Sequence, residues 1–384
     1  MKKIIYIMFF FSLCLSAQSE IIFAENLKIN TDDNTKNLLL SSIKSLFQDI
    51  DNETLNESKI TKNEIEKFSL ERISDFKTFN ENYDLKQKNF YNKQVINLYL
   101  LNEKQWIATV LYSQIADNQK EDINAIIKLF ITIEKNNQIT YSIPLPYLTK
   151  DWKKKVVQGN TYFYPDEINV KRAKIFSGKN KKIAEKLNLK VENFKFYLCN
   201  NFQEILPLLG IDYSKDLNGN TENGNGVEVQ NYIFSVKHNE DFSHDVCHFY
   251  TDKIRKNSRN WFAEEGFAYC WGDAYWTKPN GETISQKELV FELKNYLKLN
   301  SNADLLEMFD KNPILFKYLS VEVKLNKILA GIICDEVEKT KGIEGAIQLL
   351  NCGKGEDNFF KATKQLAGID RTNFNEKIKE FLNL

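Results

Sequence analysis

The sequence has no surplus of charge of either sign and, beyond its first residues, no long hydrophobic run. Lysine plus arginine number 52 and aspartate plus glutamate also number 52, which argues against nucleic acid or an anionic membrane as the main partner. After the N-terminal region, no segment is apolar over enough residues to cross a membrane. Hydrophobic residues still make up 42% of the 384 residues, which is enough for the cores of two domains.

Cysteine and histidine are both scarce. The six cysteines include no Cys-x-x-Cys pair, so a cysteine-based zinc knuckle is not expected. Five of them lie beyond the N-terminal region, and an odd number leaves at least one thiol unpaired, so we expect them mainly as small buried apolar residues. The three histidines, by contrast, all fall within eleven consecutive residues, His238 to His248.

The N-terminus has the pattern of a secretory signal peptide. A short basic region precedes an apolar run, Ile4–Leu15, which is too short to span a membrane comfortably, and small residues follow up to Ala17. We therefore predict cleavage after Ala17, which removes residues 1–17, and export to the periplasm or the cell exterior. A lipoprotein attached through Cys14 is the less favoured alternative, because Leu13 stands where a small residue is expected.

We predict an α+β fold with two domains. The first, residues 18–155, should be a small helix-plus-antiparallel-sheet domain, because helical apolar spacing is followed by segments rich in β-branched and aromatic residues. The predicted helices are Asn37–Phe47 and Thr61–Phe76, and the predicted strands are Gln94–Leu101, Trp106–Ile115, Ala125–Ile133 and Ile139–Ile143. This domain contains neither histidine nor cysteine, and we assign it no catalytic role.

The second predicted domain, residues 156–384, is mostly helical and follows a basic, polar connector at Asp151–Gly159. Its predicted strands are Phe194–Leu198 and Tyr232–Val236, and its predicted helices outside the histidine and glutamate segments are Ala173–Leu187, Asn201–Leu209, Ser285–Leu299, Ala303–Phe309, Ser320–Lys339, Gly345–Leu350, Asp357–Leu366 and Asn373–Leu382. The second strand leads directly into the histidine segment.

A histidine pair and a glutamate pair carry the predicted chemistry. His244 and His248 stand four positions apart, so on a helix they lie one turn apart on one face and can share one ion. Glu264 and Glu265 follow on a second segment of helical character. Two imidazoles and one carboxylate form the ligand set of a hydrolytic zinc site, so we predict that Zn2+ binds here. His238 precedes the helix and is expected to be structural or solvent-facing.

These segments resemble the gluzincin zinc metallopeptidases, in particular peptidase-MA-like exported proteins. His244–His248 (HDVCH) is similar to the family's His-Glu-x-x-His helix, and Trp261–Ala268 (WFAEEGFA) is similar to the segment that supplies the third ligand. The resemblance covers roughly residues 160–384. It implies a zincin-like metallopeptidase domain with one zinc ion, which hydrolyses the bonds of a peptide or protein substrate through zinc-activated water.

Asp245 departs from the family pattern, in which a glutamate follows the first histidine. That glutamate is not a ligand; it takes the proton from zinc-bound water and passes it to the leaving amine. Aspartate carries the same charge but is one methylene shorter, and a misplacement of about 1 Å can lower the rate about a hundredfold. Asp245 is therefore either the catalytic base, acting directly or through a second water, or the mark of a protein that binds metal or peptide without turnover.

The third ligand is ambiguous, because the spacing between the tryptophan and the glycine holds one extra residue. Counting from the tryptophan selects Glu264, and counting back from the glycine selects Glu265. Neighbouring helix positions differ by about 100°, so only one of the two can face the ion. We favour Glu265, since Glu-Gly-Phe-Ala is the tighter local match. Asp273 and Tyr275, shortly downstream, are candidates to orient a ligand histidine or stabilise an oxyanion, although such residues are common on loops.

Overall fold

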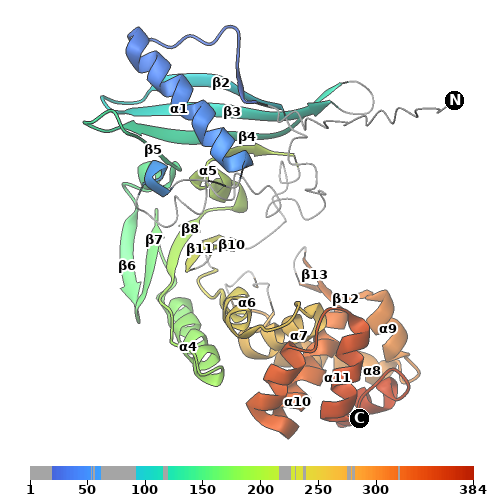
Figure 1. The fold of residues 1–384 in the computed structure, drawn as a ribbon. Coiled ribbons are helices and arrows are strands. Elements are labelled where there is room, and N and C mark those ends of the chain that lie inside the picture. Colours follow the sequence, from blue (N-terminus) through green and yellow to red (C-terminus); the bar gives the residue numbers. More distant parts are fainter. Residues whose placement is uncertain are drawn as a thin grey trace, which may run out of the picture. The chain divides into compact units, whose positions relative to one another are not determined.

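The computed structural model describes most of the chain from Glu20 onward. The described residues are 20–52, 54, 57–61, 92–115, 120–215, 226–229, 231–236, 239–274, 278, 282–318 and 321–384. The predicted signal peptide, the predicted helix beyond Thr61, and the side chains of His238 and Tyr275 lie outside them. The described chain is a mixed α and β protein with sheets in its N-terminal half and helices in its C-terminal half, which confirms the predicted α+β class (Figure 1).

The chain forms two compact units, which are described separately. One consists of Met1–Leu148 and Leu206–Gly219, and the other of Thr149–Ile205 and Asn220–Leu384. This division differs from the contiguous domains predicted from the sequence, since part of the second predicted domain returns to the first unit. The returning segment carries strand β9, Ile211–Ser214, which pairs antiparallel with β4, Glu121–Ile133. A four-residue edge strand of this kind leaves little hydrophobic pattern to predict it.

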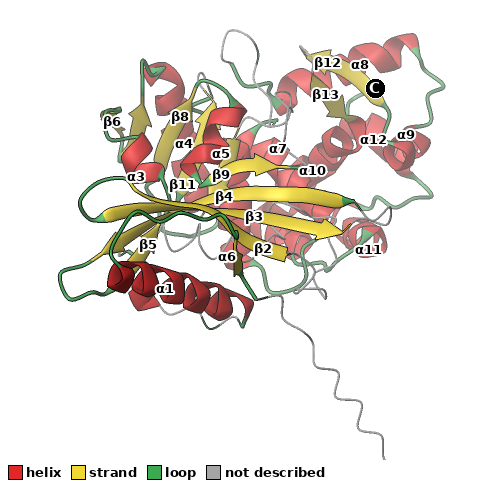
Figure 2. Cartoon of the chain, turned by 90° about the horizontal axis from the view of Figure 1, so that it is seen from above, coloured by secondary structure: helices red, strands yellow, loops and turns green. Residues whose placement is uncertain are grey.

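Helix α1, Asp33–Asp51, lies along one face of the sheet of the first unit (Figure 2). Asp32 caps its N-terminus by accepting a hydrogen bond from the Thr35 amide at 3.0 Å. The buried apolar residues of α1 recur at helical spacing and pack on the sheet, where they form the core of this unit. The helix predicted at Asn37–Phe47 is thus confirmed, and it extends further at both ends.

The sheet of the first unit has the strand order β1-β2-β3-β4-β5, with β9 paired to β4. All its pairs are antiparallel except β1 with β2. The strands along this order are β1 Ile22–Phe23, β2 Asn92–Leu100, β3 Gln105–Ile115, β4 Glu121–Ile133 and β5 Ile139–Ser142. The four strands predicted for this domain are therefore confirmed, and their order along the chain matches their order in the sheet, as in an antiparallel meander.

The second unit contains a five-stranded sheet of order β10-β11-β8-β7-β6. Strand β8 pairs in parallel with both β7 and β11, and the two outer pairs are antiparallel. The strands are β6 Lys153–Val157, β7 Asn160–Tyr164, β8 Lys195–Cys199, β10 Gly226–Val229 and β11 Tyr232–Val236. Strands β8 and β11, which the sequence predicted, are largely buried, as their continuous apolar runs require.

Strand β6 corrects the prediction of a connector at Asp151–Gly159. Three consecutive lysines of this edge strand are exposed, so the segment lacks the alternation that marks a half-buried strand. Its hairpin turn is made by Gln158 and Gly159, whose φ angles are 48° and 92°, and a tight turn of the type I′ class requires two positive φ angles. Backbone pairing with β7, rather than side-chain burial, holds β6 in the sheet.

Helices make up most of the rest of the second unit. They are α4 Val170–Lys186, α6 Ser243–Ile254, α7 Trp261–Gly272, α8 Gln286–Leu299, α9 Leu305–Lys311, α10 Leu325–Leu350, α11 Glu356–Ala367 and α12 Phe374–Phe381. Short helical turns of the chain are η1 Glu57–Lys59, α3 Leu145–Leu148, η4 Phe202–Glu204 and α5 Ile205–Leu208. The apolar faces of the longer helices join the three inner strands, β7, β8 and β11, in one hydrophobic core.

Helix α10 begins later than predicted. The predicted helix Ser320–Lys339 starts only at Leu325, because Val321–Lys324 forms strand β13, which pairs antiparallel with β12, Ile314–Tyr318. The alternation Val-Glu-Val in β13 is typical of a strand, and helical spacing starts after it. Within α10, Gly342 has a non-helical φ of 66°, shortly after Lys339, where the predicted helix ends.

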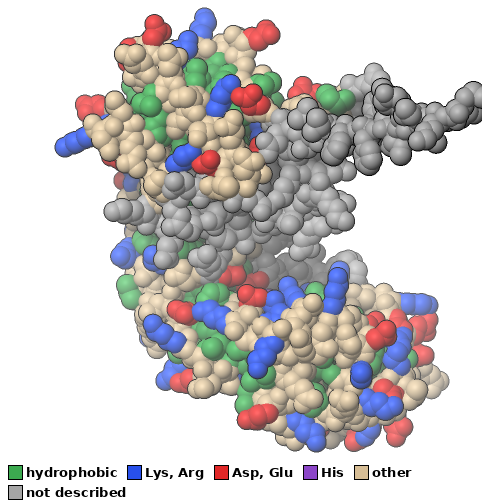
Figure 3. All heavy atoms as spheres, in the orientation of Figure 1, with side chains coloured by type: hydrophobic (Ala, Val, Ile, Leu, Met, Phe, Trp, Pro, Cys, Tyr) green, Lys and Arg blue, Asp and Glu red, His purple; other side chains and the backbone are tan. Residues whose placement is uncertain are grey.

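Charged side chains of both signs are interspersed over the face drawn in Figure 3. On this face the distribution agrees with the balanced composition of the sequence. Across the described residues, none of the helices combines the length and the apolar character that a membrane span needs.

Candidate metal centre

Helix α6 presents the two histidines that the sequence singled out. Its start is held by the Asp241 carboxylate, which accepts hydrogen bonds from the Ser243 amide (3.3 Å) and hydroxyl. Cys247 is buried in the core of the unit, as expected for a small apolar residue. His244 and His248 lie on one face of the helix, and their Nε2 atoms are 3.3 Å apart.

Helix α7 runs against α6 and carries both glutamates. Asn260 caps its N-terminus by accepting a hydrogen bond from the Ala263 amide at 3.2 Å. At its other end, a Cβ on Gly272 would lie 2.5 Å from the Ser243 carbonyl oxygen and 2.7 Å from the His244 amide nitrogen. No side chain fits in this space, so a glycine is what allows the end of α7 to approach the start of α6.

Glu265 completes a three-residue cluster with His244 and His248. Its Oε1 lies 3.4 Å from His248 Nε2, and its Oε2 lies 3.7 Å from His244 Nε2. One ligand atom from each residue lies within 4.8 Å of the others, so the group could bind a metal ion. A four-coordinate ion with bonds of about 2.0–2.1 Å separates its ligand atoms by about 3.3 Å, which is close to the spacing in this cluster.

Glu264 contacts the other nitrogen of His248. Its Oε1 lies 2.9 Å from His248 Nδ1, and a carboxylate only accepts, so Nδ1 carries the hydrogen and Nε2 faces the cluster. Arg255 Nη2 donates to Glu264 Oε2 at 2.7 Å, and Arg259 Nε lies 3.0 Å from Oε1. Of the two candidate ligands, the structure therefore brings Glu265 into the cluster and places Glu264 where it orients His248.

His244 is oriented by a backbone carbonyl. Its Nδ1 lies 3.0 Å from the carbonyl oxygen of Asp273, the residue that follows α7. Because a carbonyl only accepts, Nδ1 carries the hydrogen and Nε2 is left for an ion. Asp273 has φ 70° and ψ −176°, a conformation that residues with a side chain rarely adopt. Asp273 thus orients a candidate ligand histidine through its backbone rather than its side chain.

Lys179 of α4 links the start of α6 with the end of α7. Lys179 Nζ lies 2.8 Å from Asp241 Oδ2 and 2.7 Å from Asp273 Oδ2, and it donates to the Gly272 carbonyl at 3.3 Å. One ammonium group therefore bridges the start of the histidine helix and the residue that orients His244. Burial opposes the charge of Lys179, but the two carboxylates raise its pKa above the ordinary value.

Glu265 is buried and has cations beside it. Lys327 Nζ, from α10, lies 2.8 Å from Oε2, and Arg259 Nη2 lies 3.9 Å from Oε1. Lys327 is close enough to Oε2 for an ion pair, but its orientation does not give a hydrogen bond. Among the described residues, no other donor forms a hydrogen bond with Oε2. A buried carboxylate oxygen without a hydrogen bond is costly, and a metal ion between Glu265 and the imidazoles would satisfy it.

The charge states of the cluster follow from burial and from its close contacts. Burial lowers the pKa of His244 to about 3, which keeps its imidazole neutral, as a metal ligand must be. Burial also opposes the charge of His248, but hydrogen bonds with Glu264 and Glu265 raise its pKa to about 9. Burial favours the neutral form of Glu265, yet its contacts with His248, His244 and Lys327 hold its pKa well below the usual range. Of the three cluster residues, His248 is therefore the one that carries an extra proton, and a metal ion would replace this proton.

Asp245 lies between the two histidines on α6 and is half-buried. It is not a member of the three-residue cluster. Burial raises the pKa of Asp245 to about 7, while the charge of His248 opposes the shift and that of Glu265 adds to it. Its carboxyl group therefore changes its protonation near neutral pH.

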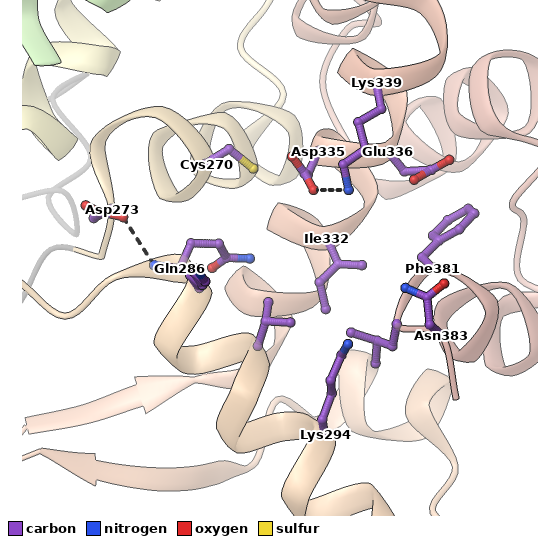
Figure 4. Close-up of a pocket in the computed structure, with 13 residues that line it drawn as sticks. Cys270, Asp273, Gln286, Lys294, Ile332, Asp335, Glu336, Lys339, Phe381 and Asn383 are labelled. Carbon is purple, nitrogen blue, oxygen red and sulfur yellow. Dashed lines mark hydrogen bonds and ion pairs between the residues drawn. The ribbon is translucent and has the colours of Figure 1, made fainter.

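A cavity of about 380 Å³ lies between α7, α8, α10 and the end of α12 (Figure 4). Charged side chains of both signs line it, and Asp335 pairs with Lys339 at 2.6 Å. None of the three cluster residues lines this cavity. Asp273, whose backbone carbonyl contacts His244, also lines this cavity. Its carboxylate accepts a hydrogen bond from the backbone amide of Gln286 at 3.3 Å. The cavity is therefore separate from the candidate metal centre.

Comparisons with known proteins do not assign the chain. No family model matches it, and no curated protein matches it either. The candidate metal centre is therefore supported by its own geometry, and the resemblance to the gluzincins remains a prediction from the sequence.

The cations around the cluster were not predicted from the sequence. Arg255 and Arg259 stand shortly before the glutamates in the sequence, and this proximity was the one signal that pointed to them. Lys179 and Lys327 come from helices far from the motif along the chain, α4 and α10. Scattered lysines are ordinary on solvated surfaces, so nothing in the sequence distinguished these two from the rest.

Proposed function

We propose that the protein is an exported zinc-dependent metallopeptidase-like enzyme that hydrolyses peptide bonds. The observation that carries the proposal is the convergence of the His244 and His248 Nε2 atoms on a Glu265 carboxylate, with each imidazole held through its other nitrogen. Metal-binding histidines almost always have such a partner on the second nitrogen. Two histidines that meet by chance on a surface have no need of it.

The donor set supports zinc as the metal. Two imidazoles and a carboxylate suit zinc, whereas magnesium and calcium prefer oxygen ligands alone. Three protein ligands are typical of catalytic zinc sites, and structural sites usually have four. When bound, zinc would supply a Lewis acid for the substrate carbonyl and lower the pKa of a water molecule.

Asp245 is the proposed general base. It follows His244 on α6, at the position where the gluzincins have glutamate. In this role its carboxylate accepts a proton from the attacking water and delivers it to the leaving amine. Its side chain is one methylene shorter than glutamate, so we expect slower turnover than a glutamate would give at this position.

Asp245 also favours a second function of a different class. A relative that has lost the catalytic glutamate would retain the ligands and bind metal or peptide without turnover. In either case the first unit, whose described strands and helix carry no histidine or cysteine, would serve to recruit a peptide or protein. The two functions share the metal centre and differ in whether Asp245 supports cleavage.

Metal analysis and a cleavage assay separate these functions. We expect about one zinc per chain of purified protein, lost in His244→Ala and retained in the matched control His238→Ala. Absence of zinc from the wild type would overturn both functions. The enzyme should show chelator-sensitive cleavage of an unfolded protein such as casein, and the rate should rise in Asp245→Glu. Activity that appears only in Asp245→Glu identifies the natural protein as the non-catalytic form.

A further inference from the structure

Two partly exposed cations contact the buried side chain of Glu265. Lys327 Nζ lies 2.8 Å from Oε2, and Arg259 Nη2 lies 3.9 Å from Oε1. The two side chains are 24% and 44% exposed, whereas Glu265 is 8% exposed. The ammonium and guanidinium groups thus connect the buried cluster with the protein surface, where a substrate would arrive.

Lys327 occupies a position that helix electrostatics disfavour. It lies in the first turn of α10, where the helix dipole repels a cation, and that turn contains no acidic residue. Its ammonium group lies 5.3 Å from the centre of the Trp261 ring, an attractive cation–π contact. Trp261 and Glu265 together therefore keep a cation beside the ligand cluster in spite of the dipole.

A divalent ion at the cluster would add positive charge beside Lys327 and Arg259. Glu265 is the one carboxylate in the three-residue cluster, so its single negative charge would face the two positive charges of the ion. With such an ion on Glu265, Lys327 would be repelled from that carboxylate, and its flexible ammonium group would become available to another anion. An anionic group of the substrate would supply this further counter-charge.

We propose that the centre selects peptide substrates with a carboxylate beside the bond to be cleaved, and that Lys327 and Arg259 recognise this carboxylate. The inference rests on the proposed metallopeptidase function. The guanidinium group of Arg259 suits a two-point contact with a carboxylate, and Lys327 supplies a mobile point charge. The carboxylate can be the C-terminus of the substrate or an aspartate or glutamate side chain, which share the same chemistry.

Peptide binding to the zinc-loaded protein tests this proposal. The Asp245→Asn background removes the proposed base, so that the peptides stay intact. The probes are a neutral pentapeptide with both ends blocked, the same peptide with a free C-terminal carboxylate, and the blocked peptide with one internal glutamate. Isothermal titration gives their dissociation constants for this parent, for Lys327→Met and for the matched control Lys324→Met. Lys324 is an exposed lysine that immediately precedes the same helix.

At least one carboxylate peptide should bind about tenfold more tightly than the neutral one. Lys327→Met should remove this advantage, and Lys324→Met should keep it. An advantage of the free C-terminus identifies the α-carboxylate as the recognised group, and an advantage of the glutamate peptide identifies an acidic side chain. Equal binding of the three peptides, no binding by any of them, or an advantage that survives in Lys327→Met overturns the proposal.

Measurements on the wild-type protein keep this inference separate from the proposed function. Zinc content and casein cleavage are determined on protein prepared in parallel. Zinc and cleavage without a preference for carboxylate peptides overturn the selectivity alone. Absence of zinc overturns the metallopeptidase function itself.

Discussion

Replacement of Lys179 by methionine should destabilise the second unit by about 3 kcal/mol. The change keeps the apolar stem but removes the ammonium group that lies 2.8 Å from Asp241 and 2.7 Å from Asp273. Asp241 is only 3% exposed, and removal of one partner from a buried pair costs about 3–5 kcal/mol. Asp273 is 26% exposed, so water compensates for part of its loss, and we expect the lower end of this range.

The same substitution should weaken zinc binding about tenfold. Lys179 holds the Asp273 side chain, and the Asp273 carbonyl orients His244. Loss of the group behind a metal-binding histidine lowers affinity about 10- to 100-fold, and the remaining hydrogen bond from the Gln286 amide to Asp273 favours the smaller effect. Urea unfolding of the metal-free protein measures the stability, and titration against a competing zinc chelator measures the affinity.

Lys182→Met is the matched control for this experiment. Lys182 lies on the same helix but is exposed, so its replacement should change neither quantity measurably. The reasoning is refuted if Lys179→Met unfolds at the same urea concentration as Lys182→Met and binds zinc as tightly. A loss of stability with unchanged zinc affinity would show that Lys179 supports the fold without orienting His244.

The contribution of Lys179 should also depend on pH in a defined direction. The pKa of Lys179 is raised in the folded protein above its ordinary value of 10.5. Its stabilisation is therefore fully present below pH 10.5 and is lost as the pH rises through the higher folded-state pKa. The difference in unfolding free energy between wild type and Lys179→Met should therefore be constant below pH 10.5 and should shrink as the pH rises above 10.5. A difference that grows with rising pH contradicts this assignment.

Three further substitutions test the choice of ligand and the packing. Glu265→Gln should lower zinc affinity much more than Glu264→Gln. The first change removes a charged ligand, whereas the second keeps an oxygen that can accept from His248 and removes only the negative charge, an effect of about tenfold. Equal affinities in chelator competition would contradict the assigned roles. Gly272→Ala should lower the free energy of unfolding by about 1–3 kcal/mol, because its Cβ would lie 2.5 Å from the Ser243 carbonyl oxygen. Unchanged urea unfolding of this variant would argue against the close approach of α6 and α7.

Elements with a clear hydrophobic period were predictable from the sequence, and elements without one were not. Helix α1 buries residues at helical spacing, and the strands β2 to β5 are runs rich in apolar and β-branched residues; each was predicted. The edge strand β6 consists mainly of exposed lysines and was taken as a connector. Its place in the sheet depends on backbone pairing with β7, which side-chain pattern does not report.

The candidate site divides in the same way. The pair His244 and His248 could be predicted because a spacing of four residues needs only the geometry of one helix. Their orienting partners were harder to find, because the partner of His244 is a backbone carbonyl, and every residue has one. The role of Asp273 therefore depends on its position after α7 and not on the chemistry of its side chain.

By itself the sequence determined the α+β class, most of the helices and strands, and the two imidazoles on one helical face, because these follow from periodicity within single elements. Only the tertiary structure decided that Glu265 rather than Glu264 joins the imidazoles. That choice depends on how α7 is rotated against its neighbours, which is set by close contacts at Gly266 with α10 and at Gly272 with the start of α6. Tertiary structure also brought Lys179 and Lys327 to the centre, since contacts between distant helices have no local signature in the chain.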